Sequence, residues 1–153
     1  MVPVQVAKIA YQTSEQRYSV ILEDQKQSRF LSIVICSNEA QAIALAIKKD
    51  TVSNSMNYDL ICDLIKKISG IIKIISIKKH NKNKFKSEIK ISYSNKKTII
   101  LESKPIDALV LALKMNTKIL VDENLLIKKN ILVNNNFKRN SKNDKKPIID
   151  LNK

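Results

Sequence analysis

Four acidic residues lie where the sequence predicts that helices begin or that a strand ends: Glu39, Asp59, Glu102 and Asp107. Clustered carboxylates can hold Mg²⁺ or Mn²⁺, and such a cation activates water and neutralises charge on a phosphodiester. If these acids converge, they provide the chemistry for hydrolysing a phosphodiester bond. Three of them also fall in first turns of expected helices, where a negative charge is favourable whatever the function. Both explanations remain open from the acids alone.

The sequence contains no other standard catalytic signature. Its single glycine, Gly70, cannot form a glycine-rich phosphate loop. The sole histidine, His80, falls in an expected turn without a partner at metal-ligand spacing. Cys36 and Cys62 are far apart and form no C-x-x-C pair, which indicates reduced thiols rather than a metal knuckle or a disulfide framework.

The charge of the chain favours a polyanionic partner. Lys and Arg number 28 against 14 for Asp and Glu, which gives a formal net charge of +14. Nucleic acid is therefore the expected partner, provided that the cations gather on one face. An alternative source of the charge is codon usage, because Lys, Ile and Asn have A/T-rich codons and only three of the basic residues are arginine.

The acids must be positioned by a fold that combines strands and helices. Apolar residues alternate with period two in three early segments, and the period then changes to helical spacing between Ala40 and Ile47. Gly70 follows a second helical segment, where a left-handed C-cap favours glycine. The expected strands are 2–7, 18–23, 30–36, 71–78, 84–93, 97–101 and 118–121, and the expected helices are 38–49, 57–69 and 105–115.

The strand and helix segments also repeat along the chain. Displaced by 68 positions, Glu39-Ala40 falls on Asp107-Ala108, and a similar apolar triplet follows in each copy. Each copy contains three strands and then a helix with an acid in its first turn. The sequence therefore predicts an α+β fold of duplicated β3-α units, with antiparallel sheets and helices packed on them. A chance match over so few residues is the alternative.

The composition predicts one domain over residues 1–129 and a basic Asn/Lys-rich tail, expected to be disordered, over residues 130–153. This tail is either an electrostatic arm for nucleic acid or a solvated segment without a function. The most apolar stretch, 71–77, is far shorter than the roughly 20 residues that span a bilayer. The N-terminus lacks the pattern of a signal peptide. A soluble protein without membrane contact is expected.

Three motifs follow one another along the chain: Phe30-Leu-Ser-Ile with Glu39-Ala-Gln-Ala-Ile, Tyr58-Asp-Leu, and Lys104-Pro-Ile-Asp-Ala with Leu111-Ala-Leu. In this order they resemble the motifs of the bifunctional nuclease domain family, whose pattern is roughly L-P-I…E-A-x-A-I, T-H-D-L and R-P-S-D-A-I-A-L-A. The resemblance covers about residues 2–128. It implies an α+β domain of bacteria, archaea and plastid-bearing organisms, and the degradation of DNA and RNA. A plastid stroma or cytoplasmic location fits this resemblance.

The acid set and the resemblance together predict the site. Glu39, Asp59 and Asp107 match the acids of the three motifs and are expected to be catalytic and to hold a divalent metal, Mg²⁺ or Mn²⁺. Glu102 matches the acid that commonly precedes the third motif, and it is expected to be a further ligand or a group that orients one. Expected contacts for nucleic acid are Lys104, Lys84, Lys86 and Lys90.

Three departures from the family pattern support a second hypothesis. Tyr58 replaces the family histidine, and an unperturbed phenol, with a pKa of about 10, cannot act as its base near neutral pH. Lys104 replaces Arg and loses its bidentate fork, and Ile106 replaces Ser and loses a hydroxyl. The alternative to a nuclease is a non-catalytic module that binds nucleic acid or protein and has lost its catalytic residues. Exposed sheet edges also make a homo-oligomer plausible.

Overall fold

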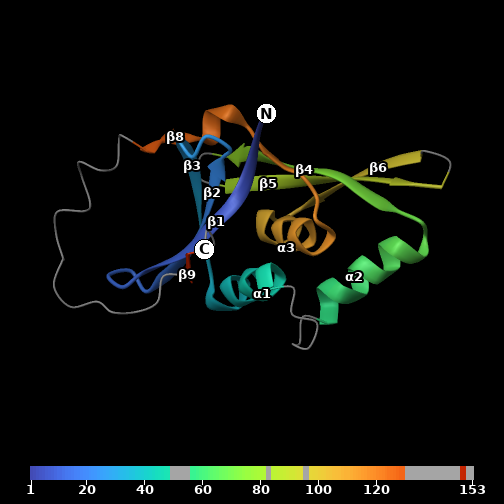
Figure 1. The fold of residues 1–153 in the computed structure, drawn as a ribbon, viewed down its shortest axis with the longest axis horizontal. Helices are drawn as coiled ribbons and strands as arrows, with labels where there is room; N and C mark the ends of the chain where they lie inside the picture. The colour runs from blue at the N-terminus through green and yellow to red at the C-terminus, as the bar shows by residue number, and fades with distance from the viewer. Residues whose placement is uncertain (49–55, 82–83, 95–96, 130–148, 151–153) are drawn as a thin grey trace.

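A single twisted sheet carries three helices on one of its faces (Figure 1). The computed structural model describes residues 1–48, 56–81, 84–94, 97–129 and 149–150. The elements in chain order are β1 (Val2–Gln12), β2 (Arg17–Asp24), β3 (Arg29–Ile35), α1 (Ser37–Lys48), α2 (Met56–Lys67), β4 (Ile71–Asn81), β5 (Lys84–Tyr93), β6 (Lys97–Ser103), α3 (Pro105–Met115), β7 (Ile119–Val121), the 3-10 turn η1 (Glu123–Leu125), β8 (Ile127–Lys128) and β9 (Ile149–Asp150).

The predicted α+β fold is confirmed, and its two halves share one sheet. The strand order is β6-β5-β4-β7-β1-β2-β3-β8, with β9 paired to β1. Each half is an antiparallel three-stranded meander followed by a helix, α1 in the first half and α3 in the second. Adding 68 to the residue numbers that bound β1, β2, β3 and α1 gives the bounds of β4, β5, β6 and α3 to within one residue. Strand β7 joins the halves by pairing antiparallel with β1 and parallel with β4.

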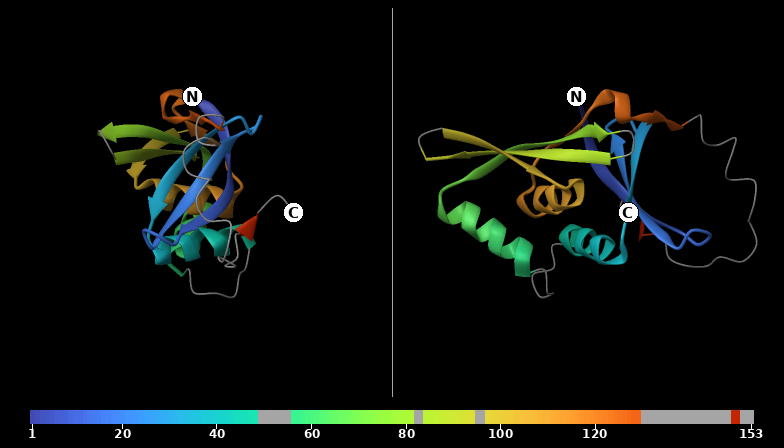
Figure 2. Two further views of the ribbon diagram at one scale, coloured as in Figure 1. Left: turned by 90° about the vertical axis from the view of Figure 1, so that its left-hand side faces the viewer. Right: turned by 180° about the vertical axis from the view of Figure 1, so that it is seen from behind.

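The core lies between this sheet and α3. Helix α3 packs against α1, α2, β4 and β5, so most of its circumference is covered (Figure 2). Leu109 and Val110 are completely buried, as are Ile75 and Ile77 on β4. This location explains why α3 is apolar on nearly every face, whereas a surface helix carries one apolar stripe.

Helix α2 is more weakly covered than α1 or α3. Cys62 and Ile65 are buried, but Leu60 and Leu64 are 70% and 61% exposed. Within the described part of the chain, no helix is long and apolar enough to cross a membrane. Of the predicted tail, Ile149–Asp150 forms β9 against Lys8 and Ile9, and the rest lies outside the described residues.

The end of α2 differs in detail from the expected glycine C-cap. The left-handed residue is Ser69, with φ of 54°, and Gly70 follows it with an ordinary φ. The N–H of Ser69 donates to the carbonyl of Lys66, and that of Gly70 donates to the carbonyl of Ile65. These two bonds form a Schellman motif, which satisfies carbonyls at the helix end. Gly70 is required for space, because a Cβ there would lie 2.9 Å from the Ile65 carbonyl oxygen.

Candidate functional site

The site is built around the first turn of α3. Pro105 occupies the first helical position, where its fixed φ suits a helix and its missing N–H costs nothing. The preceding residue, Lys104, is extended and exposed. Ser87, completely buried on β5, donates to the carbonyl oxygens of Ser103 and Lys104. This serine therefore fixes the start of α3 against the sheet, and with it the position of Asp107.

Asp107 contacts a side chain from a different helix. The Tyr58 hydroxyl, in the first turn of α2, donates a hydrogen bond of 2.6 Å to Oδ1 of Asp107. The other carboxylate oxygen of Asp107, Oδ2, accepts no hydrogen bond among the described residues. No side chain caps the start of α3, so Asp107 does not serve its own helix in this way. Its carboxylate is instead turned toward α2.

The surroundings of Tyr58 stabilise its protonated form. Burial raises the pKa of Tyr58 well above its ordinary value, because desolvation disfavours the phenolate. The hydrogen bond to Asp107, the charge of Asp107 and the charge of Glu39 raise this pKa further. Two carboxylates thus act on one phenol, and Tyr58 is a hydrogen-bond donor rather than a base at neutral pH.

Glu39 lies at the position of α1 that corresponds to Asp107 in α3, but it has a second task. Its Oε2 accepts a hydrogen bond of 2.8 Å from the backbone N–H of Cys36, the residue that precedes α1. A Glu at the third helical position that reaches back in this way is half of a capping box. The helix-cap explanation therefore applies to Glu39, although its charge also reaches Tyr58.

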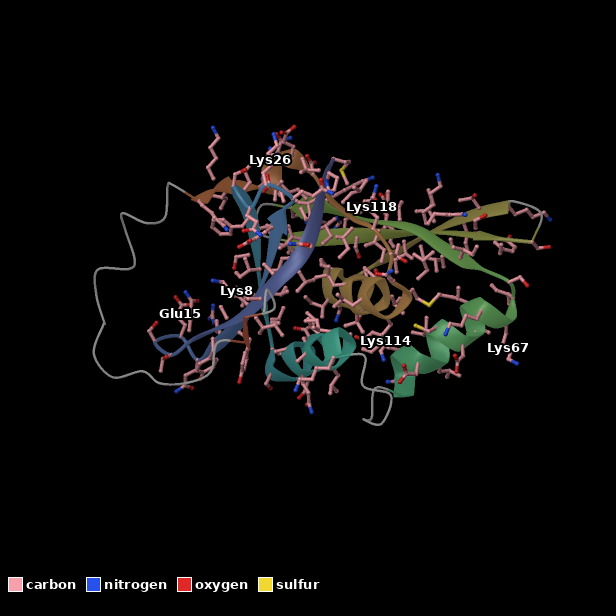
Figure 3. The ribbon with its side chains drawn as sticks, in the orientation of Figure 1. Lys8, Glu15, Lys26, Lys67, Lys114 and Lys118 are labelled. Carbon is pink, nitrogen blue, oxygen red and sulfur yellow. The ribbon has the colours of Figure 1, made fainter. Side chains whose placement is uncertain are left out.

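Asp59 is held by a lysine that sequence reasoning missed. Lys114 Nζ lies 2.7 Å from Oδ1 of Asp59, and the lysine side chain is only 12% exposed. Lys114 lies between α3 and α2 (Figure 3). Together with Tyr58–Asp107, this ion pair connects α2 to α3 at two points. Its signal in the sequence is the spacing of Asp107 and Lys114, which puts them on one face of α3 two turns apart.

Glu102 and the lysines predicted on β5 lie on the other face of the sheet. Ser87 and Ile89 of β5 are buried beneath the helices, so the alternate residues Lys86 and Lys90 point away from them. Lys86 Nζ contacts Oε1 of Glu102 at 2.7 Å, and this contact lowers the pKa of Glu102. The structure thus separates Glu102 from Asp107.

The lysines of this outer face differ in their partners. Lys86 is paired with Glu102, and Lys78 of β4 contacts Glu88 at 2.7 Å. Lys84 and Lys90 are exposed and form no ion pair within the described ranges. Lys104 is exposed at the start of α3, next in sequence to the turn that carries Asp107.

The acids do not form a three-ligand metal centre. Among the described residues, no group of three or more His, Cys, Asp or Glu side chains is arranged to hold a metal ion. Asp59 is engaged by Lys114 and Glu102 by Lys86. Glu39 and Asp107 remain, and each has one carboxylate oxygen without a hydrogen bond in the described part of the chain.

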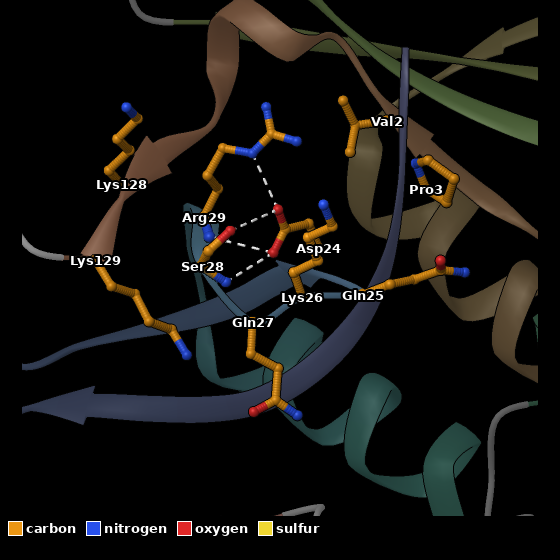
Figure 4. Close-up of a pocket in the computed structure, with 10 residues that line it drawn as sticks. All are labelled: Val2, Pro3, Asp24, Gln25, Lys26, Gln27, Ser28, Arg29, Lys128 and Lys129. Carbon is orange, nitrogen blue, oxygen red and sulfur yellow. Dashed lines mark hydrogen bonds and ion pairs between the residues drawn. The ribbon is translucent and has the colours of Figure 1, made fainter.

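A separate hollow of about 570 Å³ lies beside the β2–β3 turn and β8 (Figure 4). Arg29 bridges Asp24 at 3.0 Å and Glu123 at 2.7 Å, and so ties this turn to η1. Burial alone would raise the pKa of Asp24, but hydrogen bonds from Arg29 and Ser28 outweigh it and lower this pKa to about 2. Because its arginine is paired with acids, we regard the hollow as structural.

Comparison with known proteins adds one positive finding. The sequence profile of the bifunctional nuclease domain matches residues 20–134, which include all three helices and the whole second half of the repeat, and which begin within β2 of the first half. No curated protein matches the chain in sequence.

Proposed function

Because the chain belongs to the bifunctional nuclease domain family, we propose that it hydrolyses phosphodiester bonds of DNA and RNA at the first turn of α3. One observation carries the location of the site. Asp107 and Glu39, at equivalent positions of the two repeats, both act on Tyr58, although they belong to different helices. If each acid only stabilised the first turn of its own helix, the two would have no reason to act on the same side chain of a third helix.

Glu39 and Asp107 are the residues that would hold a divalent cation. Mg²⁺ is usually bound by one or two carboxylates together with waters and substrate phosphates, which fits two acids that each keep one oxygen without a hydrogen bond among the described residues. A bound cation of this kind activates water and offsets the charge of the phosphodiester. Asp59, held by Lys114, instead positions α2, and with it Tyr58.

Tyr58 and Lys104 have supporting roles in this proposal. The Tyr58 hydroxyl holds Oδ1 of Asp107, so Oδ2 would be the oxygen that binds the cation. Lys104 places a cation at the start of α3, where the helix dipole and free N–H groups also favour a phosphate. Binding of the nucleic-acid backbone at this turn would bring a phosphodiester next to Asp107.

A second candidate function is nucleic-acid binding without hydrolysis. Tyr58 occupies the position of the family histidine, and its raised pKa excludes it as a base near pH 7. In addition, all four predicted acids accept hydrogen bonds from the protein itself. A chain that keeps the fold but has lost this histidine would bind nucleic acid and leave it intact.

The two candidates are separated by a nuclease assay on labelled single-stranded DNA and RNA, with Mg²⁺, Mn²⁺, Ca²⁺ or EDTA. The wild-type chain is compared with Asp107→Asn and Glu39→Gln. The matched control is Asp63→Asn, an exposed acid on α2. We expect metal-dependent cleavage that falls at least about a hundredfold in Asp107→Asn and persists in the control. Binding without cleavage in every metal would instead establish the non-catalytic module.

A further inference from the structure

Strand β6 is an unprotected edge of the sheet. Six of its seven residues are exposed, and three consecutive aliphatic side chains, Ile99, Ile100 and Leu101, are 37%, 60% and 47% exposed. The strand contains no proline, and its pairing with β5 has no bulge. Natural proteins usually block such an edge with charges, bulges or covering segments, because its unpaired N–H and C=O groups attract another strand. Within the residues that the structure describes, the apolar centre of β6 has none of these devices.

The internal repeat shows that the residues equivalent to these side chains in the first half belong to the hydrophobic core. Ile99 and Leu101 correspond to Leu31 and Ile33 of β3, which are only 4% and 6% exposed. Strand β3 also has a free stretch beyond its short pairing with β8, but there only Val34 exposes a large apolar side chain. The second half of the molecule thus leaves uncovered an apolar surface that the first half buries.

Helix α2 extends the apolar surface at the same end of the molecule (Figures 1 and 2). Helical spacing puts Leu60, Leu64 and Ile68 in one stripe with Ile61 beside it, and all four are exposed. The buried residues Cys62 and Ile65 lie on the neighbouring side of the helix. The apolar arc of α2 is therefore wider than its contact with α3 requires.

We propose that a second copy of this chain pairs with β6 in antiparallel orientation, about a two-fold axis that passes by Ile100. This register pairs Ile100 with the partner's Ile100, and Ile99 with the partner's Leu101. Thr98 then faces the partner's Glu102, and Lys97 faces the partner's Ser103. Every apolar side chain of β6 meets an apolar one, and no two like charges are opposed.

The neighbouring registers place charged side chains opposite apolar ones, which favours the register centred on Ile100. Pairing must keep the helix-covered faces of both sheets on one side, so a register can shift only by whole two-residue steps. A shift one way places Lys97 opposite the partner's Leu101, and a shift the other way places Ile100 opposite the partner's Glu102. An isologous contact of this kind closes after two copies, which gives a dimer rather than a fibre. This inference does not depend on the proposed nuclease activity.

The first test measures the mass of the full chain by light scattering after gel filtration, over a range of concentrations. We expect a species of about 35 kDa, twice the mass of one chain. Ile100→Glu places two carboxylates opposite each other at the axis and should raise the dissociation constant at least about a hundredfold. The control is Val34→Glu, which adds the same charge to an exposed position of the other free edge. Circular dichroism verifies that both variants are folded.

A disulfide test checks the register. In a chain whose exposed Cys36 is replaced by Ser, Ile100→Cys should cross-link two copies under mild oxidation, because the two positions face each other. Thr98→Cys lies on the same face, but the register separates its two copies by about 14 Å, beyond disulfide reach. A monomer at all concentrations, a dimer unaffected by Ile100→Glu, or dissociation by Val34→Glu would each overturn the proposal.

Discussion

At the scale of single residues, Tyr58 decides what Asp107 can do. Burial and two carboxylates stabilise its proton, so it can orient Asp107 but cannot accept a proton from water near pH 7. A histidine in this place would titrate in the physiological range, since its ordinary pKa is about 6.5. Of the three departures from the family pattern, the one at Tyr58 is thus a change of proton chemistry.

The Tyr58→His variant is therefore expected to gain activity. The cleavage rate of single-stranded DNA, measured as kcat/KM between pH 5 and 8.5, should rise at least about tenfold over the wild type, because a positioned general base contributes 10²–10⁴-fold when it acts fully. The rate should also increase with pH through the range in which histidine loses its proton. Tyr58→Phe is the control, because it keeps the ring and removes the donor to Asp107. Equal rates in the two variants would contradict a proton-transfer role at this position.

The sequence could nominate the acids, but it could not predict which of them meet. Asp59 and Asp107 each stand in a first turn of a helix and each match a family motif. Only the packing of α2 against α3 brings Asp59 into contact with Lys114, and Asp107 into contact with Tyr58. This packing depends on contacts between residues about 50 positions apart, which local sequence patterns do not reveal. Ser87 has a signal in the sequence, because the repeat aligns it with Ser19. The structure buries both serines.

At the scale of elements, periodicity and the repeat predicted most of the architecture. The expected helix 105–115 and strand 84–93 agree with α3 and β5. Strand β1 was expected to end at residue 7 but continues to Gln12. A register shift between Val6 and Lys8 explains the difference, because an extra residue breaks the two-residue alternation on which the expectation rested. The single shared sheet depends on β7, whose three residues carry almost no pattern of their own.

The end of α2 supports a prediction about stability. Gly70→Ala should lower the free energy of unfolding by about 1–3 kcal/mol, because its Cβ would meet the Ile65 carbonyl at 2.9 Å. Ser69→Gly should instead raise it by up to about 1 kcal/mol, because glycine adopts the left-handed conformation of this position without strain. Urea unfolding measures both variants against the wild type. If Gly70→Ala is neutral and Ser69→Gly destabilises, the assigned geometry of this cap is wrong.

At the scale of the whole molecule, the net charge of +14 already subtracts every acid, so it does not say which lysines are available to a phosphate. Lys78, Lys86, Lys114 and Lys129 form ion pairs with acids, so their charge is partly offset before any ligand arrives. Lys84 and Lys90 have no such partner within the residues that the structure describes. Nucleic-acid affinity should therefore depend on particular lysines rather than on the total charge.

This difference can be measured through the salt dependence of binding. Each lysine that neutralises a phosphate contributes about 0.7 to the slope of log affinity against log salt for a single strand. Lys90→Gln should reduce the slope by about this amount, whereas Lys86→Gln should change it less, because Lys86 is already paired with Glu102. Fluorescence anisotropy with labelled single-stranded DNA from 50 to 300 mM salt provides the slopes. Equal reductions, or none, would show that the outer face of β5 does not carry the interaction.

The position of β7 has a consequence for the order in which the molecule can be completed on the ribosome. The middle of the sheet is formed by β1 and by β7, which follows it by more than a hundred residues along the chain. The first meander and α1 are synthesised early. Helix α3, which covers the core, and strand β7, which joins the two halves, are complete only when synthesis reaches residue 121. During that interval the core-facing side of the first meander lacks its cover, and contacts between such distant residues form slowly. We therefore expect nascent chains stalled before β7 to be protease-sensitive and to depend on chaperones, and chains that extend beyond it to become resistant in a single step.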